Sequence, residues 1–194
     1  VTDPNEFMSD IKAAKTVLWE FSNKDDGDLG FTHSEATIAY LNNDKWAAVF
    51  GNGPCSDAAT CGDGQAKLFI VYLDGPVGGV WNKGLQYHKI STGAGSTTKR
   101  NGLFAPRLVD LNADGAADFA YAGDLNGNVW RFDLRGKVAS SWNSAALFKG
   151  DPKQPITVRP TVTSAPSSVT AFRSSPDTPG VMVLVGTGTF LEPG

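Results

Sequence analysis

One short loop of the chain carries the residue types best suited to chemistry. Residues 110–118 place oxygen-bearing side chains at the first, third, fifth and ninth positions, with Gly115 at the sixth, where such a loop must turn sharply. Ca²⁺ is a hard cation that binds about six to eight oxygens in this kind of spacing. The sequence therefore predicts a Ca²⁺ site, whose ligands are the side chains of Asp110, Asn112, Asp114 and Asp118 and the main-chain carbonyl of Ala116.

The loop differs from an EF-hand in two ways. Position twelve is Tyr121 instead of Glu, and both flanks, residues 107–109 and 119–121, have strand patterns instead of helical ones. We expect water or one more residue to complete the shell, with moderate affinity, and Mg²⁺ to fit less well. A polar hairpin turn is the alternative, but such a turn needs fewer donors than this spacing supplies. The spacing does not separate a structural role for the ion from a regulatory one.

The remaining polar clusters indicate turns, and no catalytic arrangement is visible. Residues 25–28 and 124–128 are rich in Asp, Asn and Gly, which are typical turn residues. Residues 149–151 resemble the tripeptides that integrins recognise, a motif short enough to occur by chance. His33 and His88 are the only histidines, and neither belongs to a nucleophile and base pattern. We therefore expect a protein that is not an enzyme, with no catalytic residues and no organic cofactor.

Cys55 and Cys61 are the only cysteines and lie six residues apart in a Gly-rich stretch. A local disulfide that closes this loop is the favoured interpretation, and two free thiols remain the alternative. A zinc site would need further Cys or His ligands at suitable spacing, which the stretch lacks.

Composition narrows the class of protein. The 22 glycines and 11 prolines disfavour long helices, and no apolar run is long enough to span a bilayer. A net charge of −3 disfavours nucleic acid and anionic lipid as partners on electrostatic grounds, so neither is expected. Because the chain starts at Val1 without a signal peptide, we expect it to be a processed or excised piece.

The elements that must position the loop are short strands in a repeated order. Three segments, residues 45–52, 117–124 and 180–187, each read as a buried strand that ends in Gly and a small polar residue, with Gly51, Gly123 and Gly186 in equivalent places. Each follows another strand, at residues 36–41, 105–109 and 160–163, and the first two precede a third, at residues 67–73 and 128–134. The unit is thus an antiparallel meander.

The repeat predicts an all-β fold, a portion of a modified β-propeller built from antiparallel meander blades, with a short N-terminal helix that starts near Asp3 and continues to Ala14. Residues 1–194 form one partial propeller domain, with blade units at about 29–75, 103–136 and 156–191, and residues 16–22 end a preceding unit. Residues 138–143 and 164–175 are expected to be surface connections. A repeat cut at both ends points to a larger propeller.

Longer motifs resemble a known family. Residues 45–53 (KWAAVFGNG), 101–103 (NGL), the loop at 110–118 and residues 121–134 (YAGDLNGNVWRFDL) are similar to the C-terminal domain of the PilC/PilY type IV pilus tip proteins. Residues 18–21 (LWEF), 29–31 (LGF) and 186–188 (GTG) extend the resemblance over nearly the whole chain. The family's propeller domain is much longer, so this chain would be part of one.

The resemblance implies a function. It implies a propeller at the bacterial cell surface and pilus tip, in the outer membrane or periplasm, that promotes pilus assembly, twitching motility and adhesion. Its partners would be minor pilins at the tip and a host or abiotic surface. In the family, Ca²⁺ governs pilus extension against retraction, and the ligands carry over onto Asp110, Asn112, Asp114, the Ala116 carbonyl and Asp118.

Two other functions remain open. A fragment of a quinoprotein dehydrogenase would also combine a Gly- and Trp-rich propeller with Ca²⁺, but there the ion lies beside the quinone in the central channel, whereas this loop is contiguous. A purely structural repeat domain stapled by calcium is the other alternative.

Overall fold

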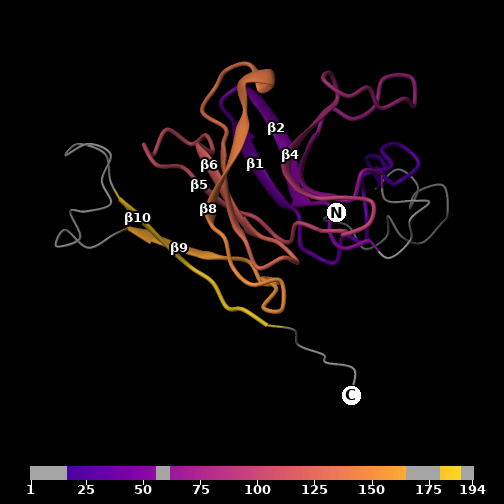
Figure 1. Ribbon diagram of the computed structural model, residues 1–194. Coiled ribbons are helices and arrows are strands. Elements are labelled where there is room, and N and C mark those ends of the chain that lie inside the picture. Colours follow the sequence, from indigo (N-terminus) through magenta and orange to yellow (C-terminus); the bar gives the residue numbers. More distant parts are fainter. Residues whose placement is uncertain (1–16, 56–61, 165–179, 189–194) are drawn as a thin grey trace, which may run out of the picture.

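The computed structural model describes residues 17–55, 62–164 and 180–188. Their regular elements are two four-stranded antiparallel sheets, a two-stranded antiparallel sheet and one turn of 3-10 helix (Figure 1). The all-β fold of antiparallel meanders is thereby confirmed. The N-terminal helix expected over residues 3–14 lies outside the described residues.

The first sheet has the order β1-β2-β3-β4 and the second β5-β6-β7-β8, so each strand pairs with its neighbour in sequence. The third sheet pairs β9 with β10. The bounds are β1 (Thr37–Leu41), β2 (Lys45–Gly51), β3 (Gln65–Tyr72), β4 (Tyr87–Gly95), β5 (Arg107–Val109), β6 (Phe119–Gly123), β7 (Val129–Asp133), η2 (Ala139–Ser141), β8 (Asn143–Phe148), β9 (Thr161–Ser164) and β10 (Val181–Leu184).

The sequence predicted meanders of three strands, so the fourth strand of each four-stranded sheet, β4 or β8, was not expected. β4 contains two glycines and several polar residues, and most of β8 is exposed, so neither has the apolar alternation that marks a half-buried strand. Residues 138–143, expected as a connection only, contain η2 and the first residue of β8. Both strands form because β3 and β7 offer a free edge.

Residues 17–22 form no strand, so the strand that their pattern suggested is not formed, and their place at the end of a preceding unit stays a prediction. They lie across the outer face of the first sheet instead. Trp19 and Phe21 pack against a cluster of buried residues that contains Leu29, Phe69 and Trp81. The aromatic and apolar pattern that resembled a strand reflects this packing of an irregular segment on a sheet face.

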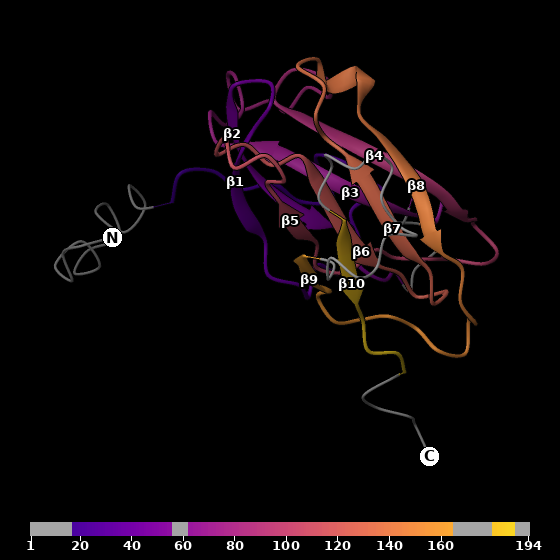
Figure 2. The ribbon, with the colours of Figure 1, turned by 90° about the vertical axis from the view of Figure 1, so that its left-hand side faces the viewer.

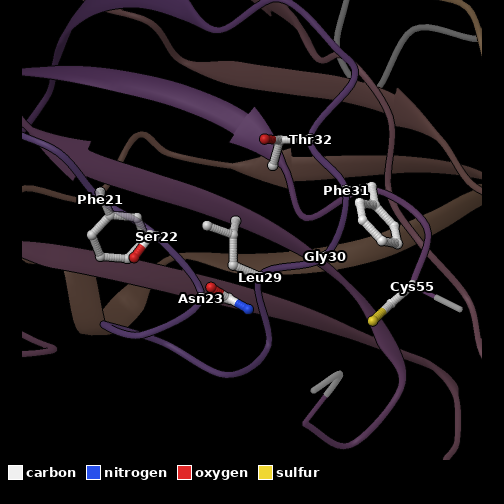
Figure 3. Close-up of a pocket in the computed structure, with 8 residues that line it drawn as sticks. All are labelled: Phe21, Ser22, Asn23, Leu29, Gly30, Phe31, Thr32 and Cys55. Carbon is white, nitrogen blue, oxygen red and sulfur yellow. The ribbon is translucent and has the colours of Figure 1, made fainter. Parts of the chain in front are cut away.

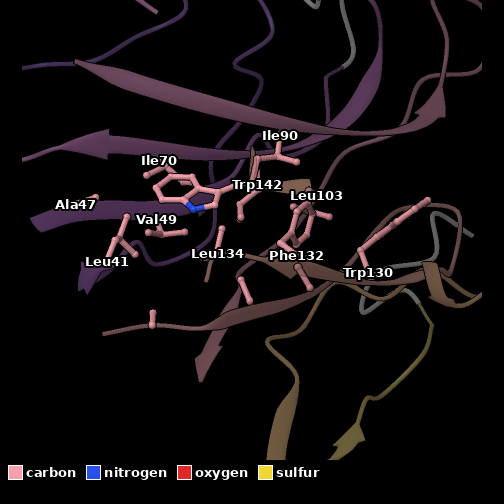
Figure 4. Packing of buried hydrophobic residues seen from close by; sticks show 14 of the residues in the cluster. Leu41, Ala47, Val49, Ile70, Ile90, Leu103, Trp130, Phe132, Leu134 and Trp142 are labelled. Atoms are coloured by element: carbon pink, nitrogen blue, oxygen red, sulfur yellow. The ribbon is translucent and has the colours of Figure 1, made fainter. Parts of the chain in front are cut away.

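The main core lies between the two four-stranded sheets. The first sheet contributes Leu41, Val49 and Ile70, and the second contributes Phe132 and Leu134, with Trp142 from the connection that follows η2 (Figure 4). β1 contacts β5, β5 contacts β9, and β4 contacts β8. Corresponding strands of successive sheets therefore lie beside one another (Figure 2). The first two sheets thus bury facing sides against each other, which is the packing that propeller blades require, whereas no residue of β9 or β10 is buried.

The two marker glycines that end β2 and β6 have the same structural role. A Cβ on Gly51 would lie 2.2 Å from the carbonyl oxygen of Leu103, and a Cβ on Gly123 would lie 2.1 Å from Cγ2 of Ile156. In each case the chain that leads into the next sheet crosses directly over the glycine. The equivalence of these two positions is thereby explained. Gly186 has only Val158 nearby, 3.8 Å from such a Cβ.

Candidate metal centre

The predicted metal loop, residues 110–118, connects β5 to β6. The two strands pair in the register Arg107 with Tyr121 and Val109 with Phe119, so the loop is the closed end of a hairpin. Both flanks are strands, as the pattern indicated. A strand hairpin holds the two ends of the loop close together, as a compact coordination shell would require.

The first half of the loop folds around its own polar side chains. The carboxylate of Asp110 accepts hydrogen bonds from the N–H groups of Asp114 (3.2 Å) and Gly115 (2.8 Å). Asn112 Oδ1 accepts from the same Asp114 N–H at 3.0 Å. These side-chain oxygens therefore face the interior of the loop, although the residues that bear them are exposed.

The Asp114 carboxylate also accepts two hydrogen bonds within the loop. Its Oδ1 accepts from the Ala116 N–H at 2.8 Å, and its Oδ2 accepts from the Asn112 side-chain amide at 2.9 Å. The bond from the Ala116 N–H, followed by that from Asn112, holds the pKa of Asp114 below its ordinary value. The carboxylate is thus ionised at neutral pH, which is the form that binds a cation.

Gly115 meets the conformational requirement that its position predicted. Its φ is +92°, and a Cβ at this residue would have no atom within 4 Å. The glycine is therefore needed for its backbone conformation and not for space. Ala113 also has a positive φ of +62°, which a non-glycine residue adopts at some cost.

The second half of the loop is buried. Asp118 is 4% exposed, and its Oδ2 accepts from the Leu111 N–H at 2.9 Å. Its Oδ1 lies 3.5 Å from the side-chain nitrogen of Asn42, which belongs to the turn between β1 and β2. The last expected ligand is therefore shared between its own loop and the neighbouring sheet, a relationship that the local spacing did not reveal.

The donor set suits Ca²⁺ by its chemistry, since it combines carboxylate, amide and carbonyl oxygens. Within the described ranges, no three or more His, Cys, Asp or Glu side chains are grouped as they would be around an ion. The oxygens of Asp110, Asn112 and Asp114 are instead occupied by N–H groups of the loop. The structure thus brings the expected ligands into one loop, and their convergence on Ca²⁺ stays a prediction.

The first acidic cluster outside this loop is part of a buried ionic network. Asp28 lies in a turn, and Asp26 lies between this turn and the preceding one. Asp28 also pairs with Lys67 (2.7 Å), and Lys89 pairs with both carboxylates. Asp63 completes the network with a 2.6 Å pair to Lys67. The local sequence shows no sign of this network, because the two lysines come from β3 and β4.

The second cluster contains a buried carboxylate that accepts four N–H groups. Asp124 is 0% exposed, and it accepts from Asn101, from Trp130 and from both the backbone and the side chain of Asn128 at 2.8–2.9 Å. Asn126 lies in the turn that precedes β7. Asp124 therefore ties the end of β6 to the chain that enters the second sheet.

Two other sequence-based expectations have clear outcomes. Cys55 is disulfide-bonded, whereas Cys61 lies outside the described residues. Cys55 also lines a cavity of about 320 Å³ with residues 21–23 and 29–32 (Figure 3). The tripeptide at residues 149–151 follows β8, and its Asp151 carboxylate accepts a hydrogen bond from the Lys153 N–H. No helix in the described part of the chain has the length and hydropathy of a membrane span.

A second cavity, of about 470 Å³, lies between β4 and the segment around η2. Its lining includes Lys83, His88, Ser140 and Trp142. Burial, together with the nearby Lys83, lowers the pKa of His88, which also makes edge contacts with the rings of Tyr72 and Trp142. His88 is therefore largely neutral at pH 7 and serves as part of the packing between sheets.

Comparison with known proteins identifies the family. The model of the PilY1 beta-propeller domain matches residues 6–194. The type IV pilus biogenesis factor PilY1 of Pseudomonas aeruginosa strain PAO1 is 37% identical over 212 residues, covering 99% of this chain and 16% of its own length. A PilY1 homolog of Xylella fastidiosa is 35% identical over 153 residues, covering 75% of this chain and 9% of its own.

A solved structure agrees with this result. The crystal structure of the Pseudomonas aeruginosa PilY1 C-terminal domain superposes with a TM-score of 0.65 at 32% identity, covering 91% of this chain and 36% of that one. The chain thus spans about a sixth of the curated Pseudomonas relative. The family match favours the pilus interpretation over the quinoprotein alternative. The chain belongs to the PilY1 β-propeller family of type IV pilus biogenesis factors.

Proposed function

We propose that this chain is the calcium-responsive part of a type IV pilus biogenesis factor that also acts as a tip adhesin. Ca²⁺ binding to residues 110–118 would regulate pilus extension against retraction and surface attachment. The protein would act by binding and not by catalysis, on the bacterial surface or in the periplasm. Its partners would be minor pilins at the pilus tip and a host or abiotic surface.

One observation carries the calcium part of the proposal. The oxygens of Asp110, Asn112 and Asp114 face the interior of one hairpin loop, within a chain whose family match covers residues 6–194. These three side chains, the Ala116 carbonyl and Asp118 would hold the ion. The ion would supply a compact positive charge that draws the exposed first half of the loop onto its buried second half.

The link to pili is supported by the relatives, which are described as type IV pilus biogenesis factors. A blade hairpin whose conformation depends on Ca²⁺ would act as a switch, because a local change in charge can alter contacts at a surface. A purely structural ion would fit the same ligands. The two roles differ in whether the ion exchanges under conditions in which the fold persists.

Calorimetry with Ca²⁺ alone tests the site in the 194-residue chain. We expect one binding event in the wild type and none in Asp110→Ala. Asp151→Ala is the matched control, because Asp151 also accepts a backbone N–H in an exposed turn but lies outside the loop. Equal affinity in the wild type and in Asp110→Ala would reject the ligand assignment.

A test of the biological role requires the full-length protein in a bacterium that makes type IV pili. With wild-type protein, surface piliation and twitching should depend on the Ca²⁺ concentration of the medium. Asp110→Ala should remove this dependence while the protein is still present at the surface. Calcium dependence that persists in the variant would show that another site is responsible.

A further inference from the structure

The residue between the last two expected ligands is held by the neighbouring sheet. The N–H of Ala117 donates to the carbonyl of Tyr40 at 2.9 Å, and its carbonyl accepts from the side-chain amide of Asn42 at 3.1 Å. Tyr40 lies on β1, and Asn42 is in the turn that follows it. Leu41 also pairs with Ala117 as an isolated parallel bridge. Both polar groups of this backbone residue therefore bond to the first sheet.

The bond to Tyr40 orients an expected ligand. The Ala116 carbonyl and the Ala117 N–H belong to the same peptide unit, and the described chain has no cis peptide bonds. In a planar trans peptide, the C=O and N–H groups point in opposite directions. The Ala117 N–H is directed at β1, so the Ala116 carbonyl is directed away from β1.

The next peptide unit is fixed in the same manner. The Ala117 carbonyl accepts from Asn42, while the Asp118 N–H donates to the Val109 carbonyl at 2.9 Å on the opposite side. Asp118 and Ala117 are only 4% and 6% exposed, so neither unit can turn freely. The backbone that bears the Asp118 carboxylate is thus set by contacts on both sides.

The two halves of the loop therefore differ in what positions them. Residues 110–115 are mostly exposed, and the hydrogen bonds described above for their side chains stay within the loop. Residues 116–118 are buried, and Ala117 and Asp118 contact Asn42, about 75 residues away in the sequence. Asn42 lies in the turn that follows β1, the strand beside β5 (Figure 2). Half of the site is preset by the adjacent sheet.

We propose that Ca²⁺ binding at residues 110–118 is coupled to the packing of the β1–β2 turn against the second sheet, through the Asn42 side chain and the Tyr40 carbonyl. This inference rests on the proposed calcium site. Asn42 is a positioning residue, since it acts through Ala117 and Asp118. Because coupling between two binding equilibria is reciprocal, an ion in the loop would tighten the contact between the sheets, and that contact would raise the affinity for the ion.

Calorimetry of the 194-residue chain with Ca²⁺ alone tests the coupling. Partners of metal ligands typically change metal affinity by about 10- to 100-fold when they are removed, so Asn42→Ala should weaken binding by at least about tenfold. Asn43→Ala is the matched control, because Asn43 is in the same turn but donates to the Tyr72 hydroxyl at 2.7 Å. Its affinity should equal that of the wild type.

Hydrogen exchange measured with and without Ca²⁺ adds a readout that a merely structural role would not change. In the wild type, Ca²⁺ should slow exchange both in residues 107–119 and in residues 37–51. In Asn42→Ala, the first effect should remain and the second should be lost. If this variant does not fold, the wild type still decides, because protection confined to residues 107–119 would overturn the coupling.

The outcomes separate the two proposals. Absence of Ca²⁺ binding by the wild type would reject the calcium site and the coupling with it. Binding of equal strength in the wild type and in Asn42→Ala, with no protection in residues 37–51, would reject the coupling alone.

Discussion

The Lys67 ammonium lies 2.7 Å from Asp28 Oδ2, and the two side chains are only 4% and 13% exposed. Lys67 projects from β3, whereas Asp28 belongs to the irregular segment 17–36, which precedes β1 and whose Trp19, Phe21 and Leu29 pack on the outer face of the first sheet. The Asn52 side-chain amide also donates to the Asp28 carbonyl. This ion pair therefore attaches the covering segment to the sheet.

Lys67→Met should destabilise the fold strongly. Removal of Lys67 takes away the cation that Asp28 and Asp63 share, although Lys89 still pairs with Asp28, so the cost typical of a broken buried pair, about 3–5 kcal/mol, is the upper limit of the loss. Urea unfolding at pH 7 measures the change in the free energy of unfolding. Lys45→Met is the control. The Lys45 and Asp74 side chains are 42% and 73% exposed, so loss of their ion pair should cost less than about 1 kcal/mol. Equal effects of the two variants would contradict the importance of burial.

The same network predicts how stability depends on acid. Burial alone would raise the pKa of Asp28, but the hydrogen bonds from Lys67 and Lys89 outweigh it and lower the pKa from 3.8 to about 2. A depressed carboxyl pKa contributes stability that is fully present above the unfolded value and is lost as the pH falls through the folded value. The contribution of Asp28 should therefore persist at pH 5 and disappear between about pH 4 and pH 2.

Melting temperatures of the wild type and Asp28→Asn test this dependence. The variant should be less stable at pH 7, and the difference between the two proteins should shrink as the pH falls from 4 to 2. A difference that stays constant over this range would show that Asp28 does not carry the effect.

Gly123→Ala should destabilise the junction between the second and third sheets. A Cβ at this position would lie 2.1 Å from Ile156 Cγ2, and overpacking of this kind costs about 1–3 kcal/mol. Thermal unfolding measures the loss. In the control Gly186→Ala, the nearest atom would be Val158 Cγ2 at 3.8 Å, an ordinary contact, so little change is expected. A stable Gly123→Ala would mean that Ile156 can move aside.

Removal of metal should lower the melting temperature of the wild type. A ligand that binds only the native state stabilises it by about 2.7 kcal/mol at a concentration 100 times its dissociation constant. Addition of a calcium chelator should therefore lower the melting temperature, and renewed Ca²⁺ should restore it. Asp114→Ala should show neither effect. An ion that leaves the wild type only on unfolding would favour a purely structural role over a regulatory one.

Local features of this protein were predictable from the sequence. The loop at residues 110–118 could be identified because its side chains bond to backbone groups within a few residues, as Asp110 does with Gly115. β2, β3, β6 and β7 could be identified because they are apolar and largely buried. The matching strands that end in Gly51 and Gly123 revealed the repeat, and the motifs around them indicated the family.

Only the tertiary structure placed β4 and β8. Their polar sequences form strands because the backbone N–H and C=O groups along the edges of β3 and β7 need hydrogen-bond partners. The tertiary structure also brought Lys67 to Asp28 and Asn42 to Ala117, across separations that no local pattern reports. The physical reason is the separation along the chain over which each kind of interaction acts. Turn chemistry and strand periodicity act between residues close in the chain, whereas ion pairs and contacts between sheets depend on register and packing, which are decided by the whole fold.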